Sequence, residues 1–219
     1  MPELRRAERR FHTVGDGVET WHSFSYGVHY DPEQIGFGPI MAINTEHVAP
    51  GRGYDVHEHA DVEIVTWVLE GVLRHEDSTG QSGDVRPGTA QRLSAGTGVR
   101  HSERNGSDTE PLVFVQTMLR SSRDDAPEYA QVEVPGDTGV LVPTVDVHAP
   151  AEVFALRLAP RGRAAVPAAA RVLVVVTSGT VVCGDLRAGE GDELRSADGL
   201  GLELASSRGA AALVWLLHA

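Results

Sequence analysis

Residues 51–71 of this chain read GRGYDVHEHADVEIVTWVLEG, a stretch that sets two histidines around one glutamate and continues the same alternation with the acids Asp61 and Glu63. Successive side chains of a β-strand point to opposite faces, so residues two apart share a face. If the segment is extended throughout, the side chains of His57, His59, Asp61 and Glu63 project to one side. The stretch therefore predicts either a metal site built on a strand or a polar bend between strands that is rich in histidine.

A second stretch, further along the chain, also places a histidine and an acid two residues apart. Residues 98–105 read GVRHSERN, which places His101 and Glu103 two apart on one face of another predicted strand. If both strands line one barrel, three imidazoles and one or two carboxylates meet there. Such a set suits iron, manganese, nickel, copper or zinc, and it contains no thiolate that would favour a softer ion. Ordinary surface or core roles are expected for the other histidines, which are His12, His22, His29, His47, His75, His148 and His218.

Short β-branched or alternating runs recur along the whole chain and are separated by turns that contain glycine. These runs predict an all-β barrel or sandwich. The one candidate helix is RSSRDDAPEYAQ at residues 120–131, where Pro127 would limit it to a turn or two.

A faint internal repeat relates the two halves. Residues 83–88 read GDVRPG and residues 184–189 read GDLRAG, and glycines Gly71 and Gly179 lie upstream of them in VLEGVL and VTSGTV. Each copy is expected to contain a strand, a glycine turn, a second strand and then a turn at the Gly-Asp pair. A duplicated fold can keep its site in one copy and lose it in the other.

The composition excludes several classes of function. There are 31 acids against 19 bases, every base is an arginine, and the net charge is −12. Direct nucleic-acid binding needs a concentrated basic face, so we expect none. No segment approaches the ~18 apolar residues of a membrane span, and the first residues lack a secretory pattern, so we expect a cytoplasmic protein without membrane contact. Cys183 is expected to be a buried, unreactive thiol.

Together the two histidine stretches resemble the double motif of the cupin superfamily, and specifically that of the pirin family of bicupins. The matching residues are Gly51, His57, His59 and Glu63 in the first motif and Gly98, His101 and Asn105 in the second. A longer spacing between Glu63 and Gly71, and Gly96 in place of the usual proline, are departures that pirins share. Residues 21–44 and 112–131 also resemble pirin segments. The resemblance is strong over residues 10–131, and beyond it only a cupin-like outline remains.

This resemblance implies an all-β bicupin, with two jelly-roll-type cupin barrels in tandem and few short helices. Residues 1–125 would form a metal-binding barrel, and residues 126–219 a degenerate barrel without ligands. The positions that correspond to the ligands in the second copy are Ala165, Pro167 and a residue near Leu202, none of which binds a metal.

The resemblance also implies a ligand set. Pirins hold iron, Fe(2+), through the residues that match here as His57, His59, His101 and Glu103. In the general cupin the glutamate of the first motif is the ligand, so Glu63 is our second choice. Glu63 could instead accept a proton from a ligand imidazole. The residues alone would also accept manganese, nickel, copper or zinc.

Two functions from different classes follow from the resemblance. The first is a dioxygenase of the quercetin 2,3-dioxygenase type, which opens a flavonol ring with dioxygen and releases carbon monoxide, with Glu103 or Glu63 as general base. The second is a non-enzymatic, redox-sensing regulator that acts through a protein partner, either a transcription factor or a metabolic enzyme. A cupin isomerase or sugar-binding barrel is a third interpretation, which Glu103 and the N-terminal stretch disfavour. The two-barrel organisation predicts a monomer.

Overall fold

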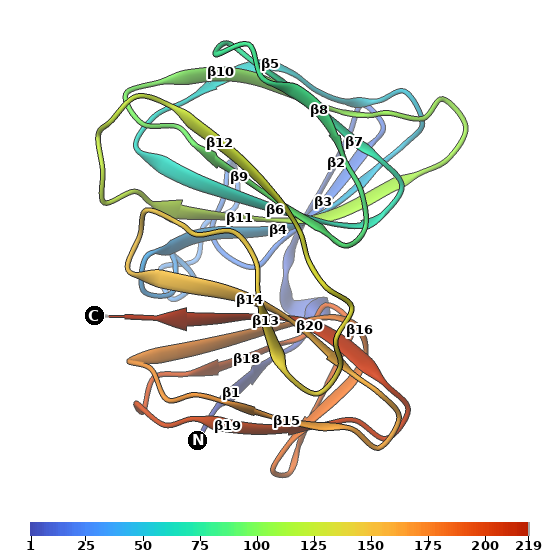
Figure 1. Cartoon of the computed structure of the whole chain (residues 1–219), viewed down its shortest axis with the longest axis vertical. Helices are drawn as coiled ribbons and strands as arrows, with labels where there is room; N and C mark the ends of the chain where they lie inside the picture. Colours follow the sequence, from blue (N-terminus) through green and yellow to red (C-terminus); the bar gives the residue numbers. More distant parts are fainter. Residues whose placement is uncertain (219) are drawn as a thin grey trace. The chain divides into compact units, whose positions relative to one another are not determined.

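The computed structural model describes residues 1–218, which fold into two compact units. The N-terminal unit contains Arg10–Glu133 and Val147–Ala149. The C-terminal unit contains Met1–Arg9, Val134–Asp146 and the chain from Pro150 onward. Figure 1 traces both units by sequence colour.

Eleven antiparallel strands in two sheets form the N-terminal unit. They are β2 (Phe11–Gly15), β3 (Val18–His22), β4 (Ile40–Val48), β5 (Gly53–His59), β6 (Val62–Glu70), β7 (Leu73–Asp77), β8 (Ser82–Val85), β9 (Thr89–Ser94), β10 (Val99–Asn105), β11 (Leu112–Arg120) and β12 (Glu128–Glu133). The larger sheet runs in the order β12-β9-β6-β11-β4-β3-β2, and the smaller runs β5-β10-β7-β8.

The larger sheet supplies most of the apolar core of this unit. Strand β6 reads VEIVTWVLE, and its β-branched and aromatic residues suit a pleated, buried strand. Val68 on β6 packs with Leu73 on β7 and with Phe114 on β11 in one fully buried cluster. This core holds the two sheets of the unit face to face.

The smaller sheet carries an alternation that matters for function. Along β10 the inward positions include the buried residues Val99, His101 and Glu103, whereas Arg100 and Arg104 are exposed. Because a strand alternates its faces, the same pleat that sends the arginines to solvent turns one imidazole and one carboxylate inward.

The C-terminal unit is a second antiparallel β structure. Its strands are β1 (Glu3–Arg5), β13 (Leu141–Pro143), β14 (Ala151–Leu158), β15 (Arg163–Val166), β16 (Arg171–Cys183), β17 (Leu186–Gly189), β18 (Glu193–Ser196), β19 (Leu202–Ala205) and β20 (Ala210–Leu217). The main path runs β1-β18-β16-β20-β14-β13, while β15 pairs with β19, and β17 and β19 pair with β16. Val172, Val174, Leu194 and Val214 are fully buried in its core.

The upstream glycines of the predicted repeat have the same role in both units. Gly71 has φ 79° and Gly179 has φ 71°. A Cβ at Gly71 would clash with the backbone of Pro111, just before β11, and one at Gly179 would clash with the backbone of Gly209, just before β20. Both positions therefore require glycine for a turn that lies against the neighbouring strand.

The expectation of a turn at each Gly-Asp pair is wrong for the first copy. Gly83 and Asp84 lie within β8, and the chain turns only at Gly88, whereas Gly184 lies in the turn between β16 and β17. In both copies a hairpin forms, β7 with β8 and the end of β16 with β17, but the Gly-Asp pair lies in the second strand of the first hairpin and in the turn of the second.

Residues 120–131 contain no helix, so that expectation is wrong as well. Pro127 ends the irregular part, and the chain then forms β12, where Tyr129 pairs with Leu93 of β9. This pairing extends the N-terminal unit to Glu133, beyond the predicted boundary at residue 125, while residues 1–9 belong to the C-terminal unit through β1. Within residues 1–218 the single helix is the 3-10 turn Ala7–Arg9, and none is long and apolar enough to cross a membrane.

Candidate metal centre

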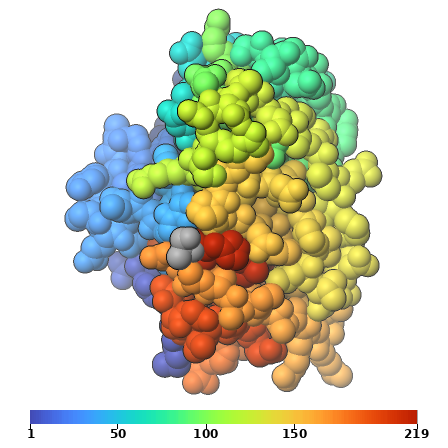
Figure 2. All heavy atoms as spheres, turned by 60° about the vertical axis from the view of Figure 1, so that its left-hand side comes forward, coloured from blue at the N-terminus to red at the C-terminus, as the bar shows by residue number. Residues whose placement is uncertain are grey.

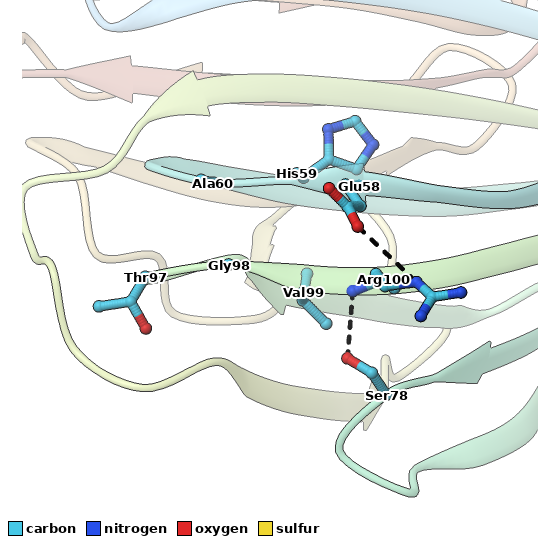
Figure 3. Close-up of a pocket in the computed structure, with 8 residues that line it drawn as sticks. All are labelled: Glu58, His59, Ala60, Ser78, Thr97, Gly98, Val99 and Arg100. Atoms are coloured by element: carbon cyan, nitrogen blue, oxygen red, sulfur yellow. Dashed lines mark hydrogen bonds and ion pairs between the residues drawn. The ribbon is translucent and has the colours of Figure 1, made fainter.

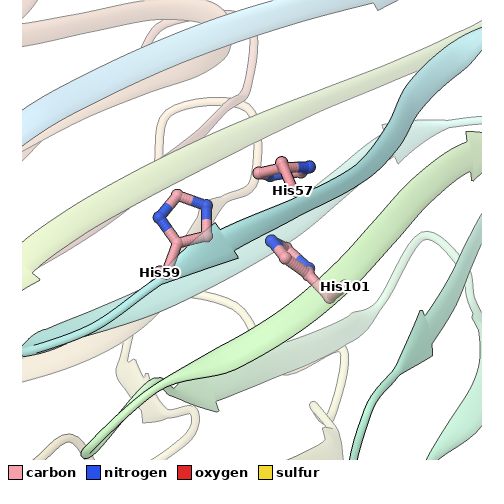
Figure 4. A group of neighbouring side chains, drawn as sticks. All are labelled: His57, His59 and His101. Carbon is pink, nitrogen blue, oxygen red and sulfur yellow. The ribbon is translucent and has the colours of Figure 1, made fainter.

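Neighbouring strands of the smaller sheet bring three histidines together. Strand β10 pairs antiparallel with β5, and in this register His101 lies directly opposite His57. The ring centroids are 4.4 Å apart for His57 and His101, 4.9 Å for His57 and His59, and 5.1 Å for His59 and His101. Figure 4 shows the three rings turned toward one another from the two strands.

The hydrogen bonds and burial of these rings leave nitrogen lone pairs available. Nδ1 of His57 lies 2.8 Å from the carbonyl oxygen of Asp55, so it donates its proton there and leaves Nε2 as the ligand atom. Burial lowers the pKa of His59 to about 4 and that of His101 to about 3, and the neighbouring His57 adds to both shifts. At neutral pH His59 and His101 are therefore uncharged, the form that binds a metal.

Glu103 lies on the same inward face of β10 and is 2% exposed. Its Oε2 accepts a hydrogen bond from the Gln116 amide at 2.8 Å, and its Oε1 has no partner. Burial raises the pKa of this carboxyl, and the Gln116 hydrogen bond opposes the shift. A cation placed nearby would stabilise the carboxylate.

A fourth histidine, His75 on β7, joins the group, although we expected an ordinary role for it. In the β7–β10 register His75 lies opposite Glu103, and Asp77 lies opposite His101. The ligand atoms of His75, His101 and Glu103 lie within 4.8 Å of one another, as do those of the three histidines described first. The two groups therefore meet at His101.

The tautomer of His75 follows from its partner. Nε2 of His75 lies 3.0 Å from the carboxylate of Asp77, and both side chains are buried. Nε2 therefore donates to Asp77, and Nδ1 keeps a lone pair with no partner. The spacing of RHED at residues 74–77 was the available signal, because it repeats the two-apart pattern of His101 and Glu103.

Glu63 does not join either group. The expectation that His57, His59, Asp61 and Glu63 share one face of one strand is wrong, because Asp61 has φ 59° and ends β5 in a turn before β6 begins. The carboxylate of Glu63 is fully buried elsewhere. It accepts hydrogen bonds from Ser94 at 2.7 Å, from Ser121 at 3.0 Å and from the backbone N–H of His148 at 3.2 Å.

The donor set fits a first-row divalent metal. Both ring nitrogens of His101, Nδ1 of His75 and Oε1 of Glu103 are buried and lack a hydrogen-bond partner. Such orphaned atoms are uncommon in native proteins and call for an unseen ion or water. With one ligand atom counted for each residue, the atoms of each group lie within 4.8 Å of one another, whereas two donors on one such ion are at most roughly 4 Å apart.

A small cavity of about 130 Å³ lies beside the histidines. Nine of its ten lining residues have polar side chains, and they come from both sheets and from the loop between β3 and β4. The lining residues are His22, Tyr26, Asn44, Glu46, Tyr54, His57, His59, Glu103, Gln116 and Met118. The loop reaches the surface of the unit, where light-blue atoms project in Figure 2, and it exposes Val28, Tyr30 and Ile35.

An open groove of about 540 Å³ also contacts His59 (Figure 3). It runs along the ends of β5 and β10, between Glu58, Gly98 and Arg100. The backbone N–H of Arg100 donates to the Ser78 hydroxyl at 3.1 Å. His59 therefore lines the cavity and the groove alike.

Comparison with known proteins identifies the family. The Pirin family model matches residues 4–119, and a protein of Mycobacterium tuberculosis is 36% identical over 232 residues, which cover 99% of this chain and 95% of that protein. The chain belongs to the pirin family. The quercetin 2,3-dioxygenase of Escherichia coli (strain K12) is 35% identical to this pirin over 205 residues, which cover 89% of each chain.

Solved structures agree with this assignment. The bacterial pirin YhhW of Escherichia coli, solved in complex with nickel(II), matches this pirin with a TM-score of 0.91 and 31% identity over all of both chains. A quercetin 2,3-dioxygenase from Acinetobacter baumannii matches with a TM-score of 0.79 and 22% identity, covering all of this chain and 87% of that one, and shows the fold alone. The predicted all-β bicupin fold is confirmed.

Among its described residues, the C-terminal unit of this pirin holds no comparable donor set. Within residues 1–218, both groups of close histidine and acidic side chains belong to the N-terminal unit. Cys183 is 8% exposed and burial raises the pKa of its thiol, which confirms the predicted burial and disfavours the thiolate.

Proposed function

We propose that this pirin is a metal-dependent dioxygenase of the quercetin 2,3-dioxygenase type, which opens a flavonol ring with dioxygen and releases carbon monoxide. The observation that carries the proposal is the cluster of orphaned, buried donors around His101 beside a polar cavity. The name of the Escherichia coli relative, 35% identical over 89% of each chain, supports the choice of substrate.

The proposed ligands are His57, His59, His101 and Glu103, and the proposed metal is Fe(2+). Manganese, nickel, copper and zinc suit the same nitrogen and oxygen donors, and the related YhhW was solved with nickel(II). When bound, the metal supplies Lewis acidity toward a substrate oxygen and redox chemistry toward dioxygen.

We assign the general base to Glu103. Gln116 holds Oε2 at 2.8 Å, so Oε1 is the oxygen that would bind the metal, and a further lone pair of the same carboxylate can take the proton of the flavonol 3-hydroxyl. Glu63 was the other candidate. Its carboxylate already accepts three hydrogen bonds and does not line the cavity, which favours Glu103.

The sizes of the two hollows suggest how a flavonol would lie. Pockets that enclose a drug-sized ligand measure about 300–1,000 Å³. The cavity of about 130 Å³ can hold only the reacting part, while the groove of about 540 Å³, which is also lined by His59, has room for the rest of the molecule.

The alternative is a redox-sensing regulator that binds a protein partner without turning over a substrate. A C-terminal unit without any group of close metal-binding side chains among its described residues favours it, because a barrel half without ligands is free to bind a partner. Cytoplasmic location and a monomeric state stay predictions under both functions.

Metal content and dioxygen uptake distinguish these possibilities. We would measure metal by elemental analysis on protein purified without chelator, together with quercetin-dependent dioxygen uptake, for the wild type, His57→Ala and Glu103→Gln. About one iron per chain, reduced in both variants and needed for uptake, supports the dioxygenase. Bound metal without uptake supports the sensor, and a wild type without metal refutes both.

A further inference from the structure

Among its described lining residues, the cavity beside the metal centre contains two acids and no cationic side chain. Glu46 and Glu103 both line it, and no arginine or lysine is present among the described residues of its lining. Burial keeps His59, another lining residue, uncharged at neutral pH by lowering its pKa to about 4. A ligand with a carboxylate would therefore meet two acids at close range.

Glu46 has no role in the proposed chemistry, yet it is the more unusual of the two acids. It lies on β4, is 2% exposed, and forms no ion pair with any residue between 1 and 218. Its Oε2 accepts hydrogen bonds from the hydroxyls of Thr20 at 2.5 Å and Tyr54 at 2.7 Å. A carboxyl is seldom buried on neutral partners alone, because burial disfavours its charged form.

The carboxyl of Glu46 can accept further hydrogen bonds. A carboxylate offers about four lone-pair positions, and the two hydroxyls both bind the same oxygen. Burial raises the pKa of Glu46 to about 7 and the charge of Glu103 adds to the shift, against the opposing effect of hydrogen bonds with Thr20, Tyr54 and Asn44. Above that pH the carboxylate predominates, and a hydroxyl is the group that can donate to it.

We propose that Glu46 is a specificity-determining residue that accepts a hydrogen bond from a second hydroxyl of the substrate, so that the cavity selects neutral, polyhydroxylated aromatic molecules. The first hydroxyl is the one presented to the metal, and to that extent the inference rests on the proposed function. Thr20 and Tyr54 position the Glu46 carboxylate by donating to one of its oxygens.

Binding of two flavonols tests this without turnover. Quercetin carries several hydroxyls besides the 3-hydroxyl, whereas 3-hydroxyflavone carries only that one. We would measure both dissociation constants by fluorescence titration at pH 8, without dioxygen, on metal-loaded wild type, Glu46→Gln and Glu70→Gln. Glu70 lies at the exposed end of β6, so its variant makes the same charge change outside the cavity.

Glu46→Gln is expected to weaken quercetin about tenfold and 3-hydroxyflavone less than twofold. A hydrogen bond to a charged group corresponds to about 10- to 100-fold in affinity, and glutamine keeps one neutral acceptor. Glu70→Gln should leave both constants at their wild-type values. Equal losses for the two flavonols, or no loss for quercetin, overturn the inference. If Glu46→Gln does not fold, equal binding of both flavonols by the wild type also overturns it.

Turnover by the wild type is read separately, so the two proposals fail independently. Glu46-dependent preference without dioxygen uptake refutes the dioxygenase and supports the recognition role of Glu46. Uptake together with a preference that Glu46→Gln leaves unchanged supports the dioxygenase and refutes that role.

Discussion

Replacement of His101 by leucine should separate two effects of the metal site on stability: the destabilisation of the metal-free protein by unsatisfied polar atoms, and the stabilisation by bound metal. His101 is 1% exposed, and neither ring nitrogen has a hydrogen-bond partner. It also belongs to both groups of potential ligands. His101→Leu removes two unsatisfied polar atoms and keeps a side chain of similar size, so the metal-free variant should unfold less readily while metal no longer stabilises it.

The magnitude follows from these atoms. Leaving a buried polar group unsatisfied costs about 1–3 kcal/mol, and a changed side-chain shape in a packed interior costs about 1–3 kcal/mol in return. With two such nitrogens, the metal-free variant should gain about 1–3 kcal/mol in free energy of unfolding. Metal at 100 times its dissociation constant stabilises the wild type by about 2.7 kcal/mol, or about 5–11 °C for a chain of this size, and should not stabilise the variant.

Thermal unfolding with and without added metal measures both effects. The matched control is His148→Leu, since His148 contacts Ser94, Arg123 and Glu128 and is outside both donor groups. That variant should lose metal-free stability and keep the full metal-induced shift. A metal-free His101→Leu protein that is clearly less stable than the wild type, or one that metal still stabilises, would refute the reasoning.

Three further predictions concern the same unit. Gly53→Ala should abolish metal binding, because a Cβ there would clash with the backbone of Glu103 and disturb the β5–β10 register; metal analysis of the folded variant checks this, and wild-type metal content would contradict it. Glu63→Gln should lower the free energy of unfolding by about 1–3 kcal/mol, measured in urea, and a simultaneous loss of metal would show that Glu63 is a ligand after all. As the pH falls from about 6.5 toward 4, the metal-free wild type should lose more stability than the metal-free His101→Leu variant, because the unfolded chain protonates His101 before the folded chain, where its pKa is about 3; equal changes of the two urea midpoints between pH 7 and 5 would disprove this.

The potential metal ligands could be predicted from the sequence where residue type and the two-residue alternation of a strand are enough to identify them. His57 and His59 flank one residue, and His101 and Glu103 likewise, so each pair must share a face of its strand. Their meeting across β5 and β10 agrees with that expectation. The turns at Gly71 and Gly179 could also be recognised as a repeat in the sequence, because a backbone position with positive φ favours glycine.

The prediction from side-chain alternation was wrong where a single residue, Asp61, interrupted the expected strand. The run from His57 to Glu63 looks continuous, but the left-handed backbone at Asp61 separates β5 from β6 and assigns Glu63 to another environment. The position of Glu63 then depends on Ser121 and on His148, which is far away in the sequence. No local pattern could have indicated these partners.

The sequence by itself determined the family, the all-β class and the chemical type of the site, because these depend on residue identity and on a two-residue period. Only the tertiary structure decided which side chains surround the metal position. It brought His75 opposite Glu103 and placed Glu46 beside the cavity through Thr20 and Tyr54. The physical reason is that a strand's sequence encodes which face a side chain occupies, whereas its neighbours across the sheet are set by long-range pairing between strands.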